Sequence, residues 1–333
     1  MSKNLSELSG RKGLDLNLFE QLGVAARETG TPDLEAQEQL SQEFLVGKSN
    51  VYGSVSFYDF LRPENQGKKI YVCNGSSCLT AGTQDEVRAK IARHFNPEEV
   101  GEMCCLGRCH ENRSFHYNGK NYSGQDIDNL VAIREQQSPT VEQYKVTSSG
   151  AAILTTPYGP VNEYYQIFKD CLQQPATDLL AQLRDSGLRG RGGAGFSMAF
   201  KLESCRNQKE ETRFIVCNAD EGDPGAYSDR YIMEQRPHSL LMGMMIAGYI
   251  AGASYGVVYI RGEYPESVQI ITEAIADLES QNLLGQNILG SGFDYHFKVI
   301  KAQGAYICGE ETALLSSIEG QRPEVRVRPP FPA

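Results

Sequence analysis

Four cysteines at two close spacings constrain this chain more than any other feature. Four residues separate Cys73 from Cys78, three separate Cys105 from Cys109, and 26 residues lie between the two pairs. Two close pairs of thiolates suit a 2Fe–2S cluster, which takes two thiolates on each iron. One tetrahedral zinc ion would accept the same four ligands, so spacing alone leaves both metals open, beside unliganded or disulfide-bonded cysteines. Cys104 stands next to Cys105, and the spacing does not decide which of the two is the ligand.

The charge balance and one long apolar segment limit the partners of the chain. The 333 residues include 32 basic and 42 acidic side chains, a net charge of −10, which argues against nucleic acid as a partner. The opening residues lack the apolar segment of a signal peptide. Residues 239–260 carry no charge, but glycines interrupt them and VVYI at 257–260 is typical of a buried strand. We therefore expect a buried helix and a buried strand rather than a membrane span, in a cytoplasmic protein.

The pattern of apolar residues divides the chain into three parts. Residues 1–66 carry helical spacing in two stretches, with a break and a helix start at Pro32-Asp33. Residues 67–140 alternate strand and helix signals, and Asn118-Gly119 between two short strands indicates a hairpin. Residues 145–333 again alternate strands and helices, as in an α/β layer fold. We expect strands over 213–217 and 295–300 and helices over 83–95, 126–136, 176–185 and 266–278.

A glycine-rich loop at residues 190–195 (GRGGAG) matches G-x-G-x-x-G, the fingerprint of dinucleotide-binding Rossmann folds. That fingerprint must follow a strand, whereas residues 178–186 show the apolar spacing of a helix. The loop is therefore not expected to belong to a true Rossmann fold. Its backbone N–H groups could still bind a phosphate, beside Arg189 and Arg191, and a plain surface loop is the alternative.

Around the cysteine pairs, the sequence resembles the thioredoxin-like 24 kDa 2Fe–2S subunit of respiratory complex I. The resemblance rests on residues 71–78 (YVCNGSSC) and 102–109 (EMCCLGRC), with 51–58 (VYGSVSFY) similar to the end of that family's helical bundle. It implies a thioredoxin-like fold for residues 67–140, after a short helical segment. It also implies one 2Fe–2S cluster on Cys73, Cys78, Cys105 and Cys109. The shorter gap between the pairs and the abbreviated helical region depart from the family.

Four ordered motifs in the last 190 residues resemble the NADH- and FMN-binding 51 kDa family of complex I. They are residues 187–196 (GLRGRGGAGF), 218–225 (NADEGDPG), 304–314 (GAYICGEETAL) and 328–333 (RPPFPA). The same module serves as the diaphorase subunit of NAD-reducing hydrogenases and of NAD-dependent formate dehydrogenases. Ser197 after Phe196, and the fusion of both domains in one chain, favour the hydrogenase type.

This resemblance assigns cofactor-binding roles along the chain. The residues implied for FMN are Gly190, Arg191, Gly192, Gly193, Lys201, Asn218, Asp220 and Glu221. The flavin and nicotinamide pocket would also be lined by Tyr306, Gly309, Glu310 and Glu311, although carboxylates in a first helical turn are also ordinary caps. Phe196 would stack on the dinucleotide, and Arg328 and Phe331 would approach its far end. Asp223 stands where the family usually has Glu, and like-charge repulsion of a 2′-phosphate would favour NADH over NADPH.

The implied function is an NADH dehydrogenase (diaphorase) module of a multisubunit oxidoreductase, with a bidirectional hydrogenase as the expected assembly. NADH would exchange a hydride with FMN, and single electrons would pass between FMN and iron–sulfur clusters, so no side chain is expected to be catalytic itself. The partners expected are NADH and other iron–sulfur and hydrogenase-type subunits. The alternatives are a flavin subunit of formate dehydrogenase or of complex I, and a non-catalytic scaffold without flavin. A thioredoxin-like redox sensor is disfavoured, because four paired cysteines suit a cluster better.

The 51 kDa family continues beyond its Pro-Pro-Phe-Pro-Ala motif with further flavin contacts and the cysteines of a 4Fe–4S cluster. This sequence stops at that motif, at residue 333. The resemblance therefore implies a chain shortened at its C-terminus, with a 4Fe–4S cluster only in the missing part.

Overall fold

The N-terminal helices pack onto a sheet that the chain forms two hundred residues later. The computed structural model describes residues 17–135, 146, 149–329 and 331–332. Its first helices are α2 (Leu18–Ala25), α3 (Leu34–Glu43) and α4 (Lys48–Val55). The predicted start at Asp33 is confirmed, because its carboxylate accepts a hydrogen bond from the Ala36 N–H over 2.7 Å. The buried faces of these helices share one core with Val257, Tyr259 and Ile300 of the later sheet.

A small mixed sheet with helices at its edges follows and positions the cysteines. Its strands are β1 (Ile70–Cys73), β2 (Val100–Met103), β3 (Phe115–Tyr117) and β4 (Lys120–Tyr122), in the order β2-β1-β3-β4. β1 pairs parallel to β2 and antiparallel to β3. The predicted hairpin at Asn118-Gly119 is confirmed, since β3 and β4 pair antiparallel and both turn residues have positive φ, 48° and 76°.

The helices of this part are shorter than the sequence predicts. They are α5 (Ser76–Thr80), α6 (Gln84–Ile91), α7 (Leu130–Arg134) and the 3₁₀ segments Pro63–Asn65, Pro97–Glu99 and Gly124–Asn129. The segment predicted as one helix from residue 126 instead opens as a 3₁₀ turn. A reciprocal capping box between Ser123 and Asp126 starts this turn. The predicted end at Gln136, and the predicted domain boundary at 140–145, lie outside the described residues.

The second sheet has three parallel strands in sequential order. They are β5 (Phe214–Ala219), β6 (Tyr255–Ile260) and β7 (His296–Lys301). The surrounding helices are α8 (Val161–Tyr164), α9 (Gln166–Leu172), α10 (Ala176–Asp185), α11 (Met198–Arg206), α12 (Ser228–Gln235), α13 (Pro237–Ala251), α14 (Pro265–Ser280) and α15 (Glu311–Ile318), with 3₁₀ turns at Ile288–Gly290 and Tyr306–Gly309. The expected strands and helices of this part are confirmed, with ends that shift by one or two residues.

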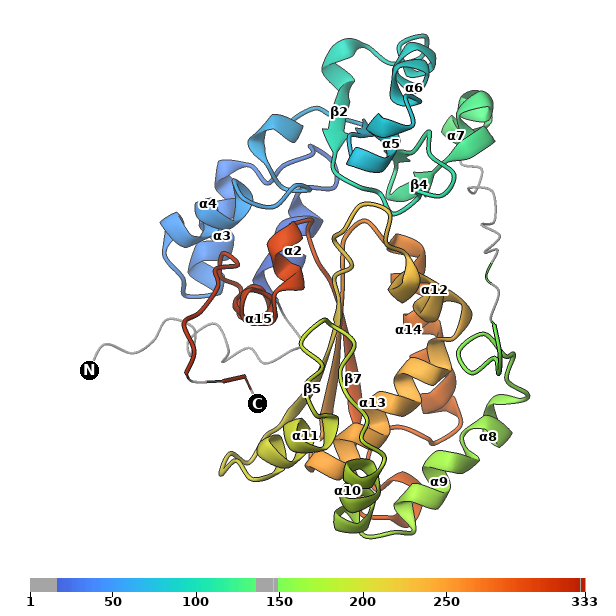
Figure 1. The fold of residues 1–333 in the computed structure, drawn as a ribbon. Coiled ribbons are helices and arrows are strands. Elements are labelled where there is room, and N and C mark those ends of the chain that lie inside the picture. The colour runs from blue at the N-terminus through green and yellow to red at the C-terminus, as the bar shows by residue number, and fades with distance from the viewer. Residues whose placement is uncertain (1–16, 136–145, 147–148, 330, 333) are drawn as a thin grey trace.

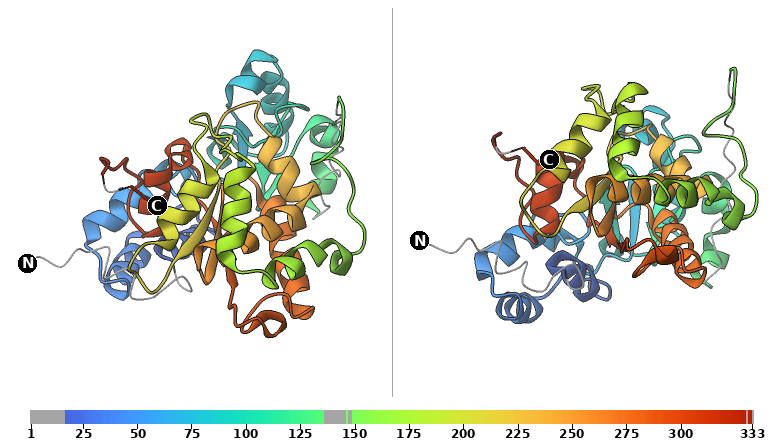
Figure 2. Two further views of the ribbon diagram at one scale, coloured as in Figure 1. Left: turned by 60° about the horizontal axis from the view of Figure 1, so that its bottom comes forward. Right: turned by 90° about the horizontal axis from the view of Figure 1, so that it is seen from below.

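Both faces of β6, the central strand of this sheet, are covered, by different parts of the chain. Along β6, Val258 and Ile260 pack in the core that includes residues of α13 and α14, whereas Val257 and Tyr259 pack in the core of the N-terminal helices. Figures 1 and 2 show these two groups of helices on opposite sides of the strands. Parallel strands that are buried on both faces consist of continuous apolar residues, which explains the apolar run of β6, while the rest of the uncharged segment is the largely buried helix α13. Within the described residues, no helix is long and apolar enough to cross a membrane.

The long helix α13 offers a matched test of this packing. A Cβ at Gly248 would lie 2.3 Å from the Tyr295 ring, whereas a Cβ at Gly243, in the same helix, would meet nothing within 4 Å. We predict that Gly248→Ala lowers the stability by about 1–3 kcal/mol, because it overpacks the core. Gly243→Ala should leave the stability unchanged or raise it by up to about 1 kcal/mol. Thermal unfolding of both variants measures the difference, and equal melting temperatures would contradict this packing.

Candidate functional site

The four predicted cysteine ligands are buried together at one end of the small sheet. Cys73 ends β1, Cys78 lies in α5, and Cys105 and Cys109 lie in the loop after β2. Each of the four is at most 8% exposed. Cys104 is exposed, so the structure favours its neighbour Cys105 as the ligand. Cys105 also adopts a left-handed backbone conformation, with φ of 40°.

The sulfur atoms form two pairs. The Sγ atoms of Cys105 and Cys109 are 3.4 Å apart, and the thiols of Cys73 and Cys78 also share a hydrogen bond. Each hydrogen bond lowers the pKa of one member, Cys78 and Cys105, to about 6, and raises the pKa of its partner. In the part of the chain that the structure describes, no three Cys, His, Asp or Glu side chains converge on one metal position. Two pairs fit the two irons of a 2Fe–2S cluster better than they fit a single zinc ion.

Backbone N–H groups point at the sulfur atoms of both pairs. The N–H groups of Gly75 and Leu106 oppose the rise that Cys78 causes in the pKa of Cys73, and that of Gly107 adds to the lowering that Cys109 causes in the pKa of Cys105. One further donor comes from the other sheet, because the Gly225 N–H donates to Cys109 Sγ over 3.1 Å. Such donors favour negatively charged sulfur, as in a thiolate or a metal-bound cysteine.

Side chains that follow β6 and lie in α12 fix the cysteine loop in place. Arg261 Nη2 donates to the Cys105 carbonyl over 2.8 Å, and Arg230 Nη1 donates to the Gly107 carbonyl over 2.8 Å. Gly107 has φ of +73°, and a Cβ there would lie 2.1 Å from the Tyr264 ring. Only glycine therefore permits this close approach. The cysteine centre and the strand ends of the second sheet form one continuous region.

A cavity of about 490 Å³ lies next to this region, where the loop after β5 meets the segment before α15. It brings together six residues that the sequence assigned to flavin or nucleotide binding: Asp220, Glu221, Asp223, Tyr306, Gly309 and Glu310. The Asn218 side-chain amide donates to the Gly309 carbonyl over 2.8 Å, so it links the two segments of this group. Tyr306 Oη donates to Asp223 Oδ1 over 2.7 Å. The loop at residues 220–226 thus lines this cavity and, through Gly225, also contacts a cysteine sulfur.

Two of the carboxylates predicted to bind the flavin or the nucleotide accept hydrogen bonds from backbone N–H groups of the protein itself. The Glu221 carboxylate accepts hydrogen bonds from the backbone N–H groups of Asp229 and Arg230, so it caps α12. The Glu310 carboxylate accepts from the Thr312 and Ala313 N–H groups at the start of α15. Helix caps of this kind hold the cavity walls in place.

Lys201 and the C-terminal segment both contact the carboxylate of Glu311, the residue after Glu310. Glu311 lies 3.3 Å from Lys201 Nζ and 2.9 Å from Arg328 Nη1. This contact joins α11, which follows the glycine-rich loop, to the start of α15. Phe331, the other residue predicted at the far end of the nucleotide, is 68% exposed and lines neither this cavity nor the next one.

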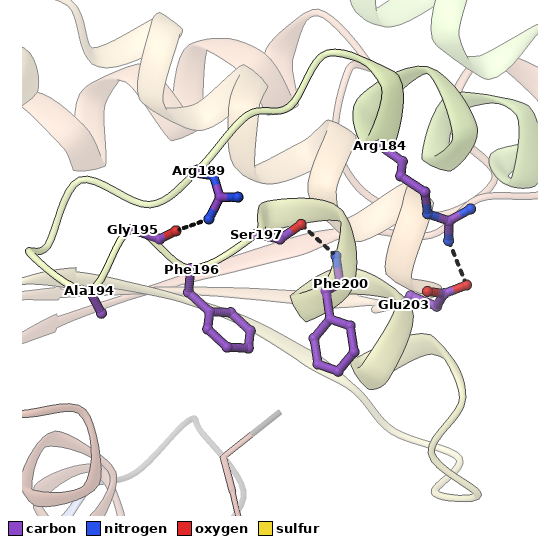
Figure 3. Close-up of a pocket in the computed structure, with 8 residues that line it drawn as sticks. All are labelled: Arg184, Arg189, Ala194, Gly195, Phe196, Ser197, Phe200 and Glu203. Atoms are coloured by element: carbon purple, nitrogen blue, oxygen red, sulfur yellow. Dashed lines mark hydrogen bonds and ion pairs between the residues drawn. The ribbon is translucent and has the colours of Figure 1, made fainter.

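The glycine-rich loop connects α10 to α11, so the prediction that it does not follow a Rossmann strand is confirmed. A second cavity, of about 550 Å³, lies beside it, and Figure 3 shows Phe196 and Phe200 with their rings together on one side. The two rings are 5.5 Å apart and more than half exposed. The predicted phosphate-binding residues Gly190, Arg191, Gly192 and Gly193 are exposed in the adjoining loop.

Sequence reasoning missed several residues of these sites. Phe200 was not assigned a role; it lies in the first turn of α11 and its ring contacts Phe196, which precedes the N-cap Ser197. Arg230, Arg261 and the Gly225 N–H carry no local signal, because their partners lie more than a hundred residues away.

Among the carboxyl groups that line the cavity of about 490 Å³, Asp220 is the one whose pKa the fold changes most. Burial, with help from the nearby Glu263, raises its pKa from 3.8 to about 7, and Arg261 opposes the shift. Its Oδ2 atom is buried and has no hydrogen-bond partner in the described residues. A carboxyl with this pKa can hold a proton near neutral pH and donate a hydrogen bond to a ligand in the cavity.

The two sites together define a class of protein, in which a thioredoxin-like 2Fe–2S domain and a flavin domain share one chain. Residues 14–137 match the family of thioredoxin-like 2Fe–2S ferredoxins, and residues 183–333 match the family of Nuo51 FMN-binding domains. The chain therefore contains a domain of each family. The expected fold class and the two expected types of cofactor domain are thereby confirmed.

Subunits of an NADH-quinone oxidoreductase and of an NAD-reducing hydrogenase, two of the expected kinds of relative, are similar to this chain. A subunit of the NADH-quinone oxidoreductase of Escherichia coli K12 is 46% identical over 157 residues, which are 47% of this chain and 35% of that protein. NAD-reducing hydrogenase HoxS subunit alpha of Cupriavidus necator is 31% identical in an alignment 324 positions long, gaps included, that covers 88% of this chain and 54% of that protein. A crystal structure of an NAD+-reducing NiFe-hydrogenase matches 96% of this chain and 57% of its own, with a TM-score of 0.73 and 27% identity. The chain spans between about a third and just over half the length of these relatives.

The adjacent cysteines 104 and 105 provide a matched test of the cysteine centre. We predict that Cys105→Ser removes bound iron and its visible absorption, because a buried thiolate ligand is lost. Cys104→Ser should leave both unchanged, since its side chain is exposed. Iron analysis and absorption spectra of anaerobically purified protein measure the outcome. Loss of iron in the Cys104 variant alone would reverse the ligand assignment.

Asp220 gives a pH-dependent prediction. Its carboxyl ionises near 3.8 in the unfolded chain and at about 7 in the fold, so folding takes up a proton between these values. The wild type therefore loses stability as the pH rises through this window, and Asp220→Asn does not. The melting temperature of the variant relative to wild type should rise between about pH 5 and about pH 8. Asp178→Asn, at an exposed position of α10, is the control. A pH-independent difference for Asp220→Asn would contradict this prediction.

Proposed function

We propose that this chain is the NADH dehydrogenase (diaphorase) module of a multisubunit NAD-linked oxidoreductase, most directly of an NAD-reducing hydrogenase. The observation that carries the proposal is the extent of similarity. The hydrogenase alpha subunit matches 88% of this chain and so includes both domains, whereas the Escherichia coli NADH-quinone oxidoreductase protein matches 47% of it. Formate dehydrogenase and complex I remain the alternatives of the same chemistry.

The residues fit a flavin nucleotide in and around the cavity of 490 Å³. When bound, FMN would accept two electrons from NADH and pass them on singly to iron–sulfur centres. The N–H groups of residues 191–193, with Arg191 and Lys201, would bind its phosphate, whereas the Gly190 N–H donates to the Phe196 carbonyl. Asn218 and Asp220 would offer polar groups to the ring, and the caps formed by Glu221 and Glu310 would keep both walls in position.

The exposed rings of Phe196 and Phe200 would hold the nicotinamide nucleotide. Aromatic faces stack on the planar rings of nucleotides. Tyr306, held by its hydrogen bond to Asp223, would lie between this nucleotide and the flavin cavity. Arg328 stands beside Glu311 in the same region, and Phe331 follows three residues later.

Cys73, Cys78, Cys105 and Cys109 would hold the 2Fe–2S cluster. The Gly225 N–H and the residues around Arg261 keep this centre against the loop that lines the flavin cavity. On this assignment residues 1–66 form the helical lead, 67–140 the cluster domain and 145–333 the nucleotide domain. Other iron–sulfur and hydrogenase-type subunits in the cytoplasm would exchange electrons with the module.

The proposal is tested on protein purified without oxygen. We predict bound iron, bound FMN, and reduction of an artificial dye that depends on NADH. Lys201→Gln should lower the FMN content, because it removes a cation expected at the phosphate. Lys209→Gln, which changes an exposed lysine after the end of α11, is the control. Iron without flavin, and no dye reduction after addition of FMN, would favour the non-catalytic scaffold instead.

The choice of nucleotide tests the role of Asp223. We predict that Asp223→Asn raises the efficiency with NADPH relative to NADH by about fivefold, the effect of roughly 1 kcal/mol between exposed like charges. Asn keeps an acceptor for the Tyr306 hydroxyl, whereas Tyr306→Phe keeps the charge and removes the hydrogen bond. Only the first variant should change the ratio in steady-state kinetics. Equal efficiency of the wild type with both nucleotides would rule out this role.

A further inference from the structure

A third cavity, of about 1020 Å³, lies where the three parts of the chain meet. Its walls come from α2, from the chain that leads into β1, from the β3–β4 hairpin and from the end of β7. None of the residues assigned to the cluster, the flavin or NADH lines it. It is therefore separate from the sites described above.

The walls of this cavity carry more positive than negative side chains, although the whole protein is negatively charged. Its walls contain five cationic side chains, Arg27, Lys68, Lys69, Arg134 and Lys301, but two carboxylates, Glu20 and Glu28, in a chain with a net charge of −10. Glu20 already pairs with Lys298 over 3.3 Å. Within the described residues, Arg27, Lys68 and Lys301 have no ion pair. This excess of positive charge favours an anion.

Lys301 is the most constrained of these cations. It is the last residue of β7 and is mostly buried. Burial lowers the pKa of its amine and the positive charge of Arg27 lowers it further, while Glu263 and Glu266 oppose the shift. No carboxylate forms a direct ion pair with this amine within the described residues, so an anion that bound here would offset the cost of burying its charge.

A neutral donor lies beside the amine. The buried Gln303 side chain follows Lys301 by two residues and also lines the cavity. A Cβ at position 23 would lie 2.4 Å from its Nε2 atom, so Gly23 permits the approach of α2 to this amide. Cations and an amide around one space match the oxygen atoms of a phosphate group.

We propose that this cavity binds the phosphate group of a small phosphorylated molecule. Its volume suits a molecule larger than inorganic phosphate, since small-molecule sites commonly measure about 300–1,000 Å³. The aromatic side chains of Phe60 and Tyr71 line the remaining wall and offer apolar surface to the rest of such a ligand. Because α2, β7 and the β3–β4 hairpin all contribute, the ligand would also hold the three parts of the chain together.

The test is isothermal titration of the full protein with two probes, inorganic pyrophosphate and ADP. We expect both to bind the wild type, and Lys301→Met to weaken both by about tenfold or more, because a charge-assisted hydrogen bond is lost. Tighter binding of ADP than of pyrophosphate would indicate a nucleotide ligand, and equal binding a free phosphate compound. Lys209→Met, at an exposed position beyond the opposite end of the sheet, should leave both affinities unchanged.

Two further variants keep the test decisive. Lys301→Arg should retain binding, and Arg27→Gln, at an exposed position, should weaken it without affecting the fold. No binding of either probe to the wild type would overturn the proposal. Binding of ADP that Lys301→Met and Arg27→Gln leave unchanged would place the nucleotide in the NADH region and would also overturn it.

Discussion

The guanidinium of Arg261 joins the two redox regions of this protein. It follows directly after β6, is 4% exposed, and donates to the carbonyl of Cys105 on one side and to that of Glu221 on the other. Its charge is balanced by Glu263, 3.1 Å away. A buried arginine is stable only when its donors are satisfied, so this side chain requires the cysteine loop and the cavity loop to stay in register.

Much of the surrounding structure supports that contact. Glu221 caps α12, and its neighbours Asp220 and Asp223 line the proposed flavin cavity, while Gly225 donates to Cys109. The proposed flavin site and the cysteine centre are therefore two sides of one loop, six residues long between Asp220 and Gly225. The N-terminal helices cover one face of β6 and β7 in the second sheet, which carries these strand ends.

The sequence predicted the chemistry of the sites better than their connections. Cysteine spacing and four ordered motifs predicted the four buried cysteines and six residues of the proposed flavin cavity, because these signals are local. The buried helix and strand at 239–260 were also predictable, from glycines within an uncharged segment. The docking of α2–α4 onto the second sheet was not, since it depends on residues such as Phe19 and Tyr259 that lie far apart in sequence. The role of Arg261 was hidden for the same reason, and Glu221 could be recognised as a cap of α12 only from its hydrogen bonds, whereas a capping role was already open for Glu310.

The loop from Asp220 to Gly225 lines the proposed flavin cavity and also contacts the cysteine centre. The central proposal is therefore that electrons that enter at the flavin cavity reach the cysteine centre through this loop. Electron paramagnetic resonance of the anaerobic, flavin-loaded protein after addition of NADH alone tests this most directly. We predict the signal of a reduced 2Fe–2S cluster, of the same shape as that obtained with dithionite. If dithionite produces this signal and NADH does not, although NADH still reduces an artificial dye, the two sites are not connected and the proposal is wrong.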